Sequence, residues 1–213
     1  IHNVIDRQLE MKTVELLINQ GVTVIEASAF MRLTPAVVYF RAKGLSQAED
    51  GTVTVKNRVI AKVSRPSVAK QFMNCASSAV ITALREKKMI SHEEARLLAY
   101  VPVADDITVE ADSGGHTDNM PLVNILPEII QLRNSIISKK KFSRKIRVGA
   151  AGGISTPFAA HAAFTLGADY IVTGSINQSC MEASTSVLVK EMLSKAAVSD
   201  TVMAPASDMF EKG

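Results

Sequence analysis

The sequence predicts an α/β fold, a (β/α)8 TIM-type barrel, and three observations lead to this fold class. Short runs rich in valine and isoleucine alternate with helical stretches along most of the 213 residues, as in a parallel sheet covered by helices. The G-x-G-x-x-G pattern of a doubly wound dinucleotide-binding fold follows none of these runs. Glycine-containing turns follow the last two runs instead, and barrel enzymes commonly bind phosphate after their seventh and eighth strands.

The valine- and isoleucine-rich runs are expected to be buried parallel strands. They span residues 22–27, 59–64, 106–111, 146–150 and 170–173. If the last two are the seventh and eighth strands of a barrel, the run that begins at residue 22 is the fourth strand. Five strands do not close a barrel. The sequence shown is therefore expected to lack the first strands of a single domain that covers residues 1–213.

Helices are expected between these strands, at residues 9–20, 35–43, 67–89, 93–100, 122–138 and 157–166. Thr34 and Thr156 each place a capping hydroxyl before a first-turn proline. Ser91 and Glu94 have the spacing of a capping box. Glycines that follow helices are expected to take the left-handed conformation that ends them, at Gly21, Gly44 and Gly167.

Two segments are longer than the ordinary connections of a barrel. Residues 45–58 are polar and contain an acidic turn that ends in Gly51, which indicates a hairpin or a surface loop. Residues 67–102 form a long helical insertion between two strands. Extra outer helices are its simplest interpretation; a lid and the contact face of a homodimer are the alternatives.

Composition excludes several classes of protein. Hydrophobic residues make up 47% and charged residues 21%, as in an ordinary globular protein. Aromatic residues are only 5%, without tryptophan, which argues against a surface that stacks nucleic-acid bases. The net charge of +3 is slight. One basic run is interpreted as a solvated helix end, with docking of an acidic carrier partner as the alternative: Lys139, Lys140, Lys141, Arg144 and Lys145.

The cysteines, membrane signals and metal ligands narrow the possibilities further. Cys75 and Cys180 are too few for a disulfide framework and are expected to be buried free thiols. No apolar run reaches the roughly 18 residues of a membrane span, and no signal peptide is recognisable. No metal-ligand cluster emerges from the spacing. A cytoplasmic enzyme that has no contact with a membrane fits these observations best.

The turns after the last two strands predict a phosphate site. At Ala151, Gly152 and Gly153 a strand ends, the backbone turns without bulky side chains, and a helix opens. Free amide groups and the positive end of a helix dipole suit a phosphate dianion. A second donor-rich turn closes the next strand, at Thr173, Gly174 and Ser175. Two such turns on consecutive strands favour phosphate binding over the alternative of two merely structural turns.

Two ionisable residues are candidates for catalysis. His116 follows Gly114 and Gly115 at the carboxyl end of a strand, where a histidine can give or take a proton over the barrel mouth. A surface histidine bonded to a neighbouring aspartate is the alternative. Lys62 interrupts an apolar strand, either to balance negative charge at the mouth or to reach solvent from a strand end. Glu110, like Glu26, would then pair with Lys62 in a structural role.

These residues resemble a known family. The chain is similar to the FMN-dependent enoyl reductases that act in trans with polyketide and polyunsaturated fatty-acid synthases, which are relatives of the nitronate monooxygenases (2-nitropropane dioxygenases). The similarity covers nearly the whole chain. Its most specific stretches are residues 24–31, 61–66, 103–118, 150–154, 173–178 and 204–210.

The resemblance implies a barrel with FMN at its mouth, NADPH as the source of hydride, and an α,β-unsaturated thioester presented on an acyl carrier protein of the synthase. His116 matches the family's active-site histidine. The phosphate loops of the family match the residues already named, Gly152, Gly153, Gly174 and Ser175. Two alternatives remain, a nitronate monooxygenase that uses oxygen without NADPH, and a non-catalytic interaction component of a synthase complex.

Overall fold

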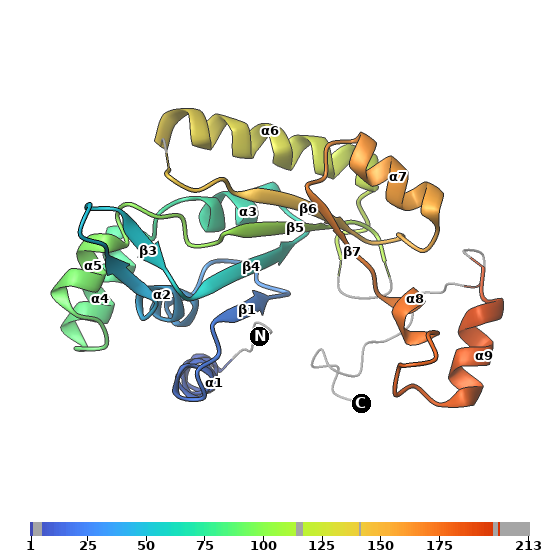
Figure 1. Cartoon of the computed structure of the whole chain (residues 1–213), viewed down its shortest axis with the longest axis horizontal. Coiled ribbons are helices and arrows are strands. Elements are labelled where there is room, and N and C mark those ends of the chain that lie inside the picture. The colour runs from blue at the N-terminus through green and yellow to red at the C-terminus, as the bar shows by residue number, and fades with distance from the viewer. Residues whose placement is uncertain (2–5, 114–116, 141, 198–199, 201–213) are drawn as a thin grey trace. The chain divides into compact units, whose positions relative to one another are not determined.

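A computed structural model describes residues 1, 6–113, 117–140, 142–197 and 200 of the chain (Figure 1). The chain divides into two compact units, Ile1–Val172 and Thr173–Gly213. Each unit is described by itself, and the expectation of one domain over residues 1–213 stays a prediction. No helix among these residues has both the length and the apolar character needed to cross a bilayer.

The first unit contains a parallel sheet whose strands lie in the order β1-β4-β5-β6-β7. The strands of this sheet are β1 (Val24–Ala27), β4 (Arg58–Val63), β5 (Asp106–Glu110), β6 (Arg147–Ala151) and β7 (Tyr170–Val172). The spatial order follows the chain without the reversal that a doubly wound sheet requires. This is the arrangement of a barrel wall, so the predicted fold class and all five predicted strands are confirmed.

One face of the sheet is apolar and covered by helices. Side chains alternate between the two faces of a strand. The buried apolar side chains on this face include Ala27, Val59, Ala61, Val63, Ile107, Val109, Val148 and Ala150. Helix α3 (Pro66–Met73) contacts β4 and β5, α6 (Leu122–Lys140) contacts β5 and β6, and α7 (Pro157–Thr165) contacts β7 (Figure 1).

The opposite face of the sheet carries the polar residues. Register pairs Ile60 with Asp106 and then Arg147, so these three positions share one layer of the face. The next layer toward the carboxyl ends contains Lys62, Thr108, Gly149 and Tyr170. In a barrel wall this face points inward. The sequence therefore places its charged strand residues where the barrel interior and mouth lie.

Helices α1 (Arg7–Asn19) and α2 (Pro35–Ala42) flank β1 in the sequence and pack against each other. Thr34 is expected from its sequence to cap α2, but its side chain makes no capping hydrogen bond. Its hydroxyl instead donates to the buried carboxylate of Glu10 on α1, where burial raises the pKa of that carboxyl. Thr156 does cap α7, accepting from the Ala159 amide, and the capping box of Ser91 is present.

The single helix expected over residues 67–89 is wrong, because the chain breaks into two helices. Helix α3 ends at Met73, and α4 (Ser78–Glu86) begins after Ser77, which accepts a hydrogen bond from the Val80 amide. Asn74 lies between them in an extended conformation, and its carbonyl accepts from the Val103 amide. The local sequence pattern that predicts a helix contains no sign of this long-range hydrogen bond. Helix α5 (His92–Leu97) completes the insertion.

The polar segment after α2 is a hairpin of β2 (Leu45–Gln47) and β3 (Val53–Val55). Gly44 does not take the expected left-handed conformation, unlike Gly21 and Gly167, whose φ angles are 72° and 101°. Gly44 is required for another reason, since a Cβ atom there would lie 2.3 Å from the Asn57 amide nitrogen. Close approach, rather than backbone conformation, selects glycine at this position.

A buried ion pair joins α2 to the start of β5. The guanidinium of Arg41 is fully buried, and its Nη1 lies 2.7 Å from Oδ2 of Asp105. Arg41 also donates to the carbonyl oxygens of Pro102 and Asn57 at 3.1 and 3.0 Å. The same Asp105 oxygen accepts from the Val59 amide at 3.1 Å. Three segments, α2, the start of β4 and the loop before β5, are thereby held together near the sheet's amino ends.

The second unit contains α8 (Ser175–Gln178) and α9 (Val187–Lys195). Neither helix is predicted from the sequence. Ser186 caps α9 by accepting a hydrogen bond from the Val189 amide. Both cysteines are free, as expected, but Cys180 is exposed and Cys75 only partly buried, so the prediction of buried thiols is wrong. The small and apolar residues beside each cysteine in the sequence do not reveal whether the cysteine side chain points into the protein core.

Candidate functional site

The carboxyl ends of β4, β5 and β6 bring several candidate residues to one edge of the sheet. Lys62 lies on β4, Glu110 ends β5, and Ala151 ends β6. Glu110 and Ala151 are direct partners in the strand register. Because parallel strands end at the same edge, their side chains and the turns that follow are neighbours. This edge is the candidate site of the first unit.

Lys62 forms an ion pair at this edge. Its Nζ lies 3.0 Å from Oε1 of Glu110, and the two side chains are 24% and 16% exposed. The expected pairing with Glu110 is present. Glu26, the other expected partner, accepts a hydrogen bond from the Ser28 hydroxyl at 2.7 Å. The catalytic role of Lys62 stays a prediction, but its charge is held on the polar face rather than extended into bulk water.

The turn after β6 contains two glycines in a backbone conformation that other residues rarely adopt. Gly152 and Gly153 have φ angles of 95° and 67°, in the region that favours glycine. A Cβ atom on Gly152 would lie 2.6 Å from the carbonyl oxygen of Ala111, so the backbone of this turn passes close to the end of β5. A Cβ atom on Gly153 would meet nothing within 4 Å. The turn leads along the chain into α7, and these residue types before a helix start fit a phosphate group.

The second predicted phosphate turn lies in the second unit. Gly174 precedes α8, with a φ of −113°, and Ser175 begins the helix. The hydroxyl of Thr173 donates to Oδ1 of Asn177 at 3.1 Å, while Nδ2 of Asn177 donates to the Thr173 carbonyl at 3.0 Å. These bonds make a closed local turn. The contribution of residues 173–175 to phosphate binding stays a prediction.

Gly114, Gly115 and His116 lie outside the described residues, so their predicted roles are not tested. A hydrogen bond joins the segments before and after them. The Asp112 amide donates to the Met120 carbonyl at 3.0 Å.

Asp118 ties the segment after β5 to the segment after β4. Arg65 donates from Nε and Nη2 to its two carboxylate oxygens at 2.8 and 2.6 Å. The Ser64 hydroxyl donates to Oδ2 at 2.6 Å. Hydrogen bonds from Arg65 and then Ser64 lower the pKa of Asp118. Sequence reasoning assigned no role to Ser64 and Arg65, although both lie in the same short motif as Lys62.

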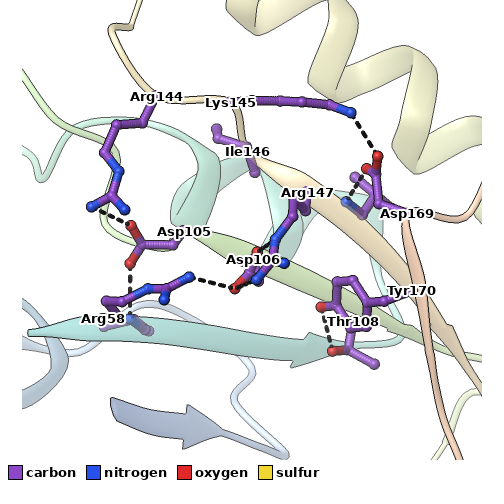
Figure 2. Close-up of polar contacts among 12 residues, drawn as sticks. Arg58, Asp105, Asp106, Thr108, Arg144, Lys145, Ile146, Arg147, Asp169 and Tyr170 are labelled. Carbon is purple, nitrogen blue, oxygen red and sulfur yellow. Dashed lines mark hydrogen bonds and ion pairs between the residues drawn. The ribbon is translucent and has the colours of Figure 1, made fainter. Parts of the chain in front are cut away.

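A charged cluster around Asp106 and Arg147, labelled in Figure 2, lies one layer closer to the amino ends of the strands than Lys62. Arg147 donates from Nε and Nη2 to both carboxylate oxygens of Asp106, at 2.6 and 2.8 Å. Arg58 approaches the same carboxylate, with Nη2 3.7 Å from Oδ2. The Arg147 guanidinium also lies 5.7 Å from the ring centre of Tyr170. Nothing in the sequence pattern linked these residues, because their contact depends on strand register.

Tyr170 crosses the sheet above this cluster. Its hydroxyl lies 2.8 Å from that of Thr108 (Figure 2), two strands away, and burial raises the pKa of the phenol to about 12. At the residue before β7, Asp169 binds Arg133 and Lys145 at 2.9 and 2.6 Å. The contacts of Tyr170 and of Asp169 connect the strands between their amino ends and the layer of Lys62.

Two further features bear on the site. Among the described residues, no group of three or more histidine, cysteine, aspartate or glutamate side chains could hold a metal ion. An open hollow of about 550 Å³ lies between the β2–β3 hairpin and α5, lined by residues that include Gln47, Arg96 and Tyr100. It lies apart from the carboxyl edge of the sheet. At this hollow, Arg96 donates hydrogen bonds of 2.6 Å to Glu93 and to Gln47.

No family model matches the chain, but individual proteins do. It is 49% identical over 213 residues to the polyketide biosynthesis protein PksE of Bacillus subtilis, covering 100% of this chain and 28% of that protein. It is 51% identical over 215 residues to one component of the polyunsaturated fatty acid synthase of Thraustochytrium, covering 100% of this chain and 14% of that component. The chain thus spans less than a third of either relative.

A solved structure is also similar. The enoyl reductase domain of MlnA, from the macrolactin biosynthesis cluster of Bacillus amyloliquefaciens, superposes with a TM-score of 0.93 and 42% identity. The match covers 99% of this chain and 48% of that domain's chain. The chain is therefore similar over its whole length to proteins of polyketide and polyunsaturated fatty-acid synthesis and to an enoyl reductase domain, and the resemblance indicated by its sequence is confirmed.

Proposed function

We propose that the protein acts as an FMN-dependent enoyl reductase. It uses NADPH to reduce the α,β double bond of enoyl thioesters on acyl carrier protein, in polyketide or polyunsaturated fatty-acid biosynthesis. The observation that carries this proposal is the similarity to the MlnA enoyl reductase domain across 99% of the chain. The glycine turn and the Lys62–Glu110 pair at one edge of the sheet support a cofactor site there.

The chain's residues have distinct roles in this proposal. The amides at Gly152 and Gly153 hold the FMN phosphate, joined by residues 173–175 and by Ala151 at the end of β6. Gly114 and Gly115 let the backbone approach the flavin ring. When bound, FMN supplies the hydride that reduces the β-carbon of the substrate. Lys62 balances the negative charge that collects on the reduced ring, and His116 delivers the proton to the α-carbon.

Partners follow from the same proposal. The substrate arrives on an acyl carrier protein, and the remaining modules of the synthase supply and consume the thioester. The carbon–carbon double bond accepts one hydride and one proton, and NADPH leaves as NADP⁺, so the reaction balances without oxygen. A homodimer formed through outer helices is a further part of this proposal.

The first experiment is a visible absorption spectrum of the purified full-length protein, followed by NADPH addition without oxygen. We expect a flavin spectrum that bleaches with NADPH and returns when an enoyl thioester on carrier protein is added. A flavin that NADPH leaves oxidised, but that turns over nitronates with oxygen, would instead favour a nitronate monooxygenase. A colourless protein that binds carrier protein would favour a non-catalytic component.

His116 is tested by separating the two half-reactions. In His116→Ala we expect normal bleaching by NADPH and slowed reoxidation by the enoyl thioester, because only the second step needs a proton at the α-carbon. Unchanged reoxidation would remove His116 from the mechanism.

The phosphate turn is tested with Gly153→Ala, and the chain offers a matched control. Gly21 has a φ of 72° against 67° for Gly153, and a Cβ atom at either position meets nothing within 4 Å. Gly21→Ala and Gly153→Ala therefore carry similar backbone strain. We expect only Gly153→Ala to weaken FMN binding, by tenfold or more as measured by flavin fluorescence. Equal FMN affinity in both variants would argue against a phosphate at this turn.

A further inference from the structure

The Lys62–Glu110 pair has an arrangement that the packing of the sheet does not require. Lys62 is the register partner of Thr108, whereas Glu110 lies two residues further toward the carboxyl end of β5. Two residues of a strand span about 6–7 Å. The Lys62 side chain therefore leans along the strand toward the carboxyl edge to reach Glu110 at 3.0 Å. Glu110 fixes where the ammonium group is held.

The pair lies next to the glycine turn. Glu110 is the register partner of Ala151, and the residue after Ala151 is Gly152, whose backbone passes close to the Ala111 carbonyl. The ammonium and the carboxylate are thus on the polar face of the sheet, within a residue or two of the turn that fits a phosphate. Any charged ring held at this edge would experience the field of both groups, in a partly buried setting where screening by water is weakened.

The two charges act in opposite senses on a bound flavin. A cation near the ring stabilises the reduced form, which carries more negative charge, while a carboxylate disfavours it. A neighbouring carboxylate also cancels part of the cation's field. An isolated lysine at this position would push the reduction equilibrium further toward the reduced flavin than the pair does.

We propose that Glu110 is a positioning residue that holds the Lys62 ammonium at the sheet's carboxyl edge and offsets its charge, so that neither charge alone shifts the reduction potential of the bound flavin. This inference rests on the proposed function. It gives Glu110 a role of its own at the flavin, in addition to the role proposed for Lys62. It also predicts opposite effects of removing the two partners, which a purely structural ion pair would not produce.

The chain contains a matched control pair. Lys43 and Glu94 approach to 2.9 Å, with side-chain exposures of 31% and 16%, almost the same as the pair at the site. They join α2 to α5, in the part of the fold that carries the hairpin and the helical insertion. Glu94→Gln retains the capping-box residue type at that position. Both control substitutions should therefore leave the flavin unaffected.

The test measures the flavin midpoint potential by spectroelectrochemistry in Glu110→Gln, Lys62→Met and the double variant, beside Glu94→Gln and Lys43→Met. We expect a more positive potential in Glu110→Gln, a more negative one in Lys62→Met, and a value near wild type when both are replaced. A tenfold change in the reduction equilibrium is about 30 mV for a two-electron couple, and we expect shifts of at least this size.

Several outcomes would decide against the inference. Potentials that stay constant, or that move in the same direction in both single variants, would overturn it and leave Glu110 as a structural partner. Equal shifts in the control pair would overturn it too, since they would indicate a global effect. The thermal unfolding midpoint of each variant without flavin checks that the fold is intact. A wild-type protein that binds no flavin would instead contradict the proposed function itself.

Discussion

The hydroxyl of Tyr170 lies 2.8 Å from that of Thr108, although Gly149 stands between them in the register of three adjacent strands. The phenol ring reaches Thr108 by lying across the backbone of Gly149. A Cβ atom on that glycine would be 2.2 Å from Cε2 of the ring. Because Gly149 on β6 has no side chain, Tyr170 on β7 can form a hydrogen bond with Thr108 on β5.

Gly149→Ala is expected to destabilise the protein by about 1–3 kcal/mol, because the ring must move to admit the methyl group. Urea denaturation measures the change in the free energy of unfolding. In a Tyr170→Ala background the same substitution should have a much smaller effect, since the clash is gone. Equal effects in the two backgrounds would show that the ring does not lie over Gly149.

Tyr170→Phe should change how stability depends on alkaline pH. Burial raises the pKa of Tyr170 from its ordinary value of 10.0 to about 12, so the folded state keeps the phenol neutral where the unfolded state ionises. Its contribution to stability is full below pH 10 and is lost as the pH rises toward 12. We expect the wild-type advantage over Tyr170→Phe to shrink by about 2–3 kcal/mol across that window. A constant difference in the unfolding free energy would contradict this.

Arg41→Met should be strongly destabilising. The substitution leaves the Asp105 carboxylate buried without its main partner, which typically costs about 3–5 kcal/mol. Arg96→Met is the control, because Arg96 pairs with Glu93 where both side chains are well exposed. Exposed pairs contribute about 0–1 kcal/mol. Chemical denaturation of both variants should separate them clearly, and similar losses would show that the buried pair contributes no more to stability than the exposed one.

Asp118→Asn should remove part of the protein's acid sensitivity. Hydrogen bonds from Arg65 and Ser64 lower the pKa of Asp118, so this carboxylate stabilises the fold above its unfolded pKa near 3.8. That contribution is lost as the pH falls below this value and through the lowered pKa. We expect a flatter stability profile below pH 4 in the variant. A stability profile below pH 4 as steep as that of the wild type, measured by urea denaturation at each pH, would contradict this role of Asp118.

The strands were predictable because burial on the helix-covered face leaves a direct record in the sequence. Val59, Ala61 and Val63 are buried and alternate with less buried residues, and each of the five strands was located to within two residues at either end. The helix break at Asn74 was not predictable, because it depends on a carbonyl used by Val103. Local propensity contains no information about a partner 29 residues away.

The site was only partly accessible to sequence reasoning. Glycines with an unusual backbone, such as Gly153, stand out at a strand–helix turn, and Lys62 stands out as a charge in an apolar strand. The Asp118 contacts with Ser64 and Arg65 did not stand out, since they join loops that only the strand order brings together. Thr34 shows the converse, because a correct capping pattern was overridden by a buried carboxylate on another helix.

The two ends of the segment that carries the β2–β3 hairpin lie close together and are joined by hydrogen bonds. The Lys56 amide donates to the Gly44 carbonyl at 2.8 Å, and Asn57 Nδ2 donates to the Phe40 carbonyl at 2.9 Å. The exposed turn at Asp50 and Gly51 is thus tethered independently of the sheet that carries the candidate site. A fluorophore or an affinity handle inserted at this turn would report on the protein in a cell while leaving the carboxyl edge of the sheet undisturbed.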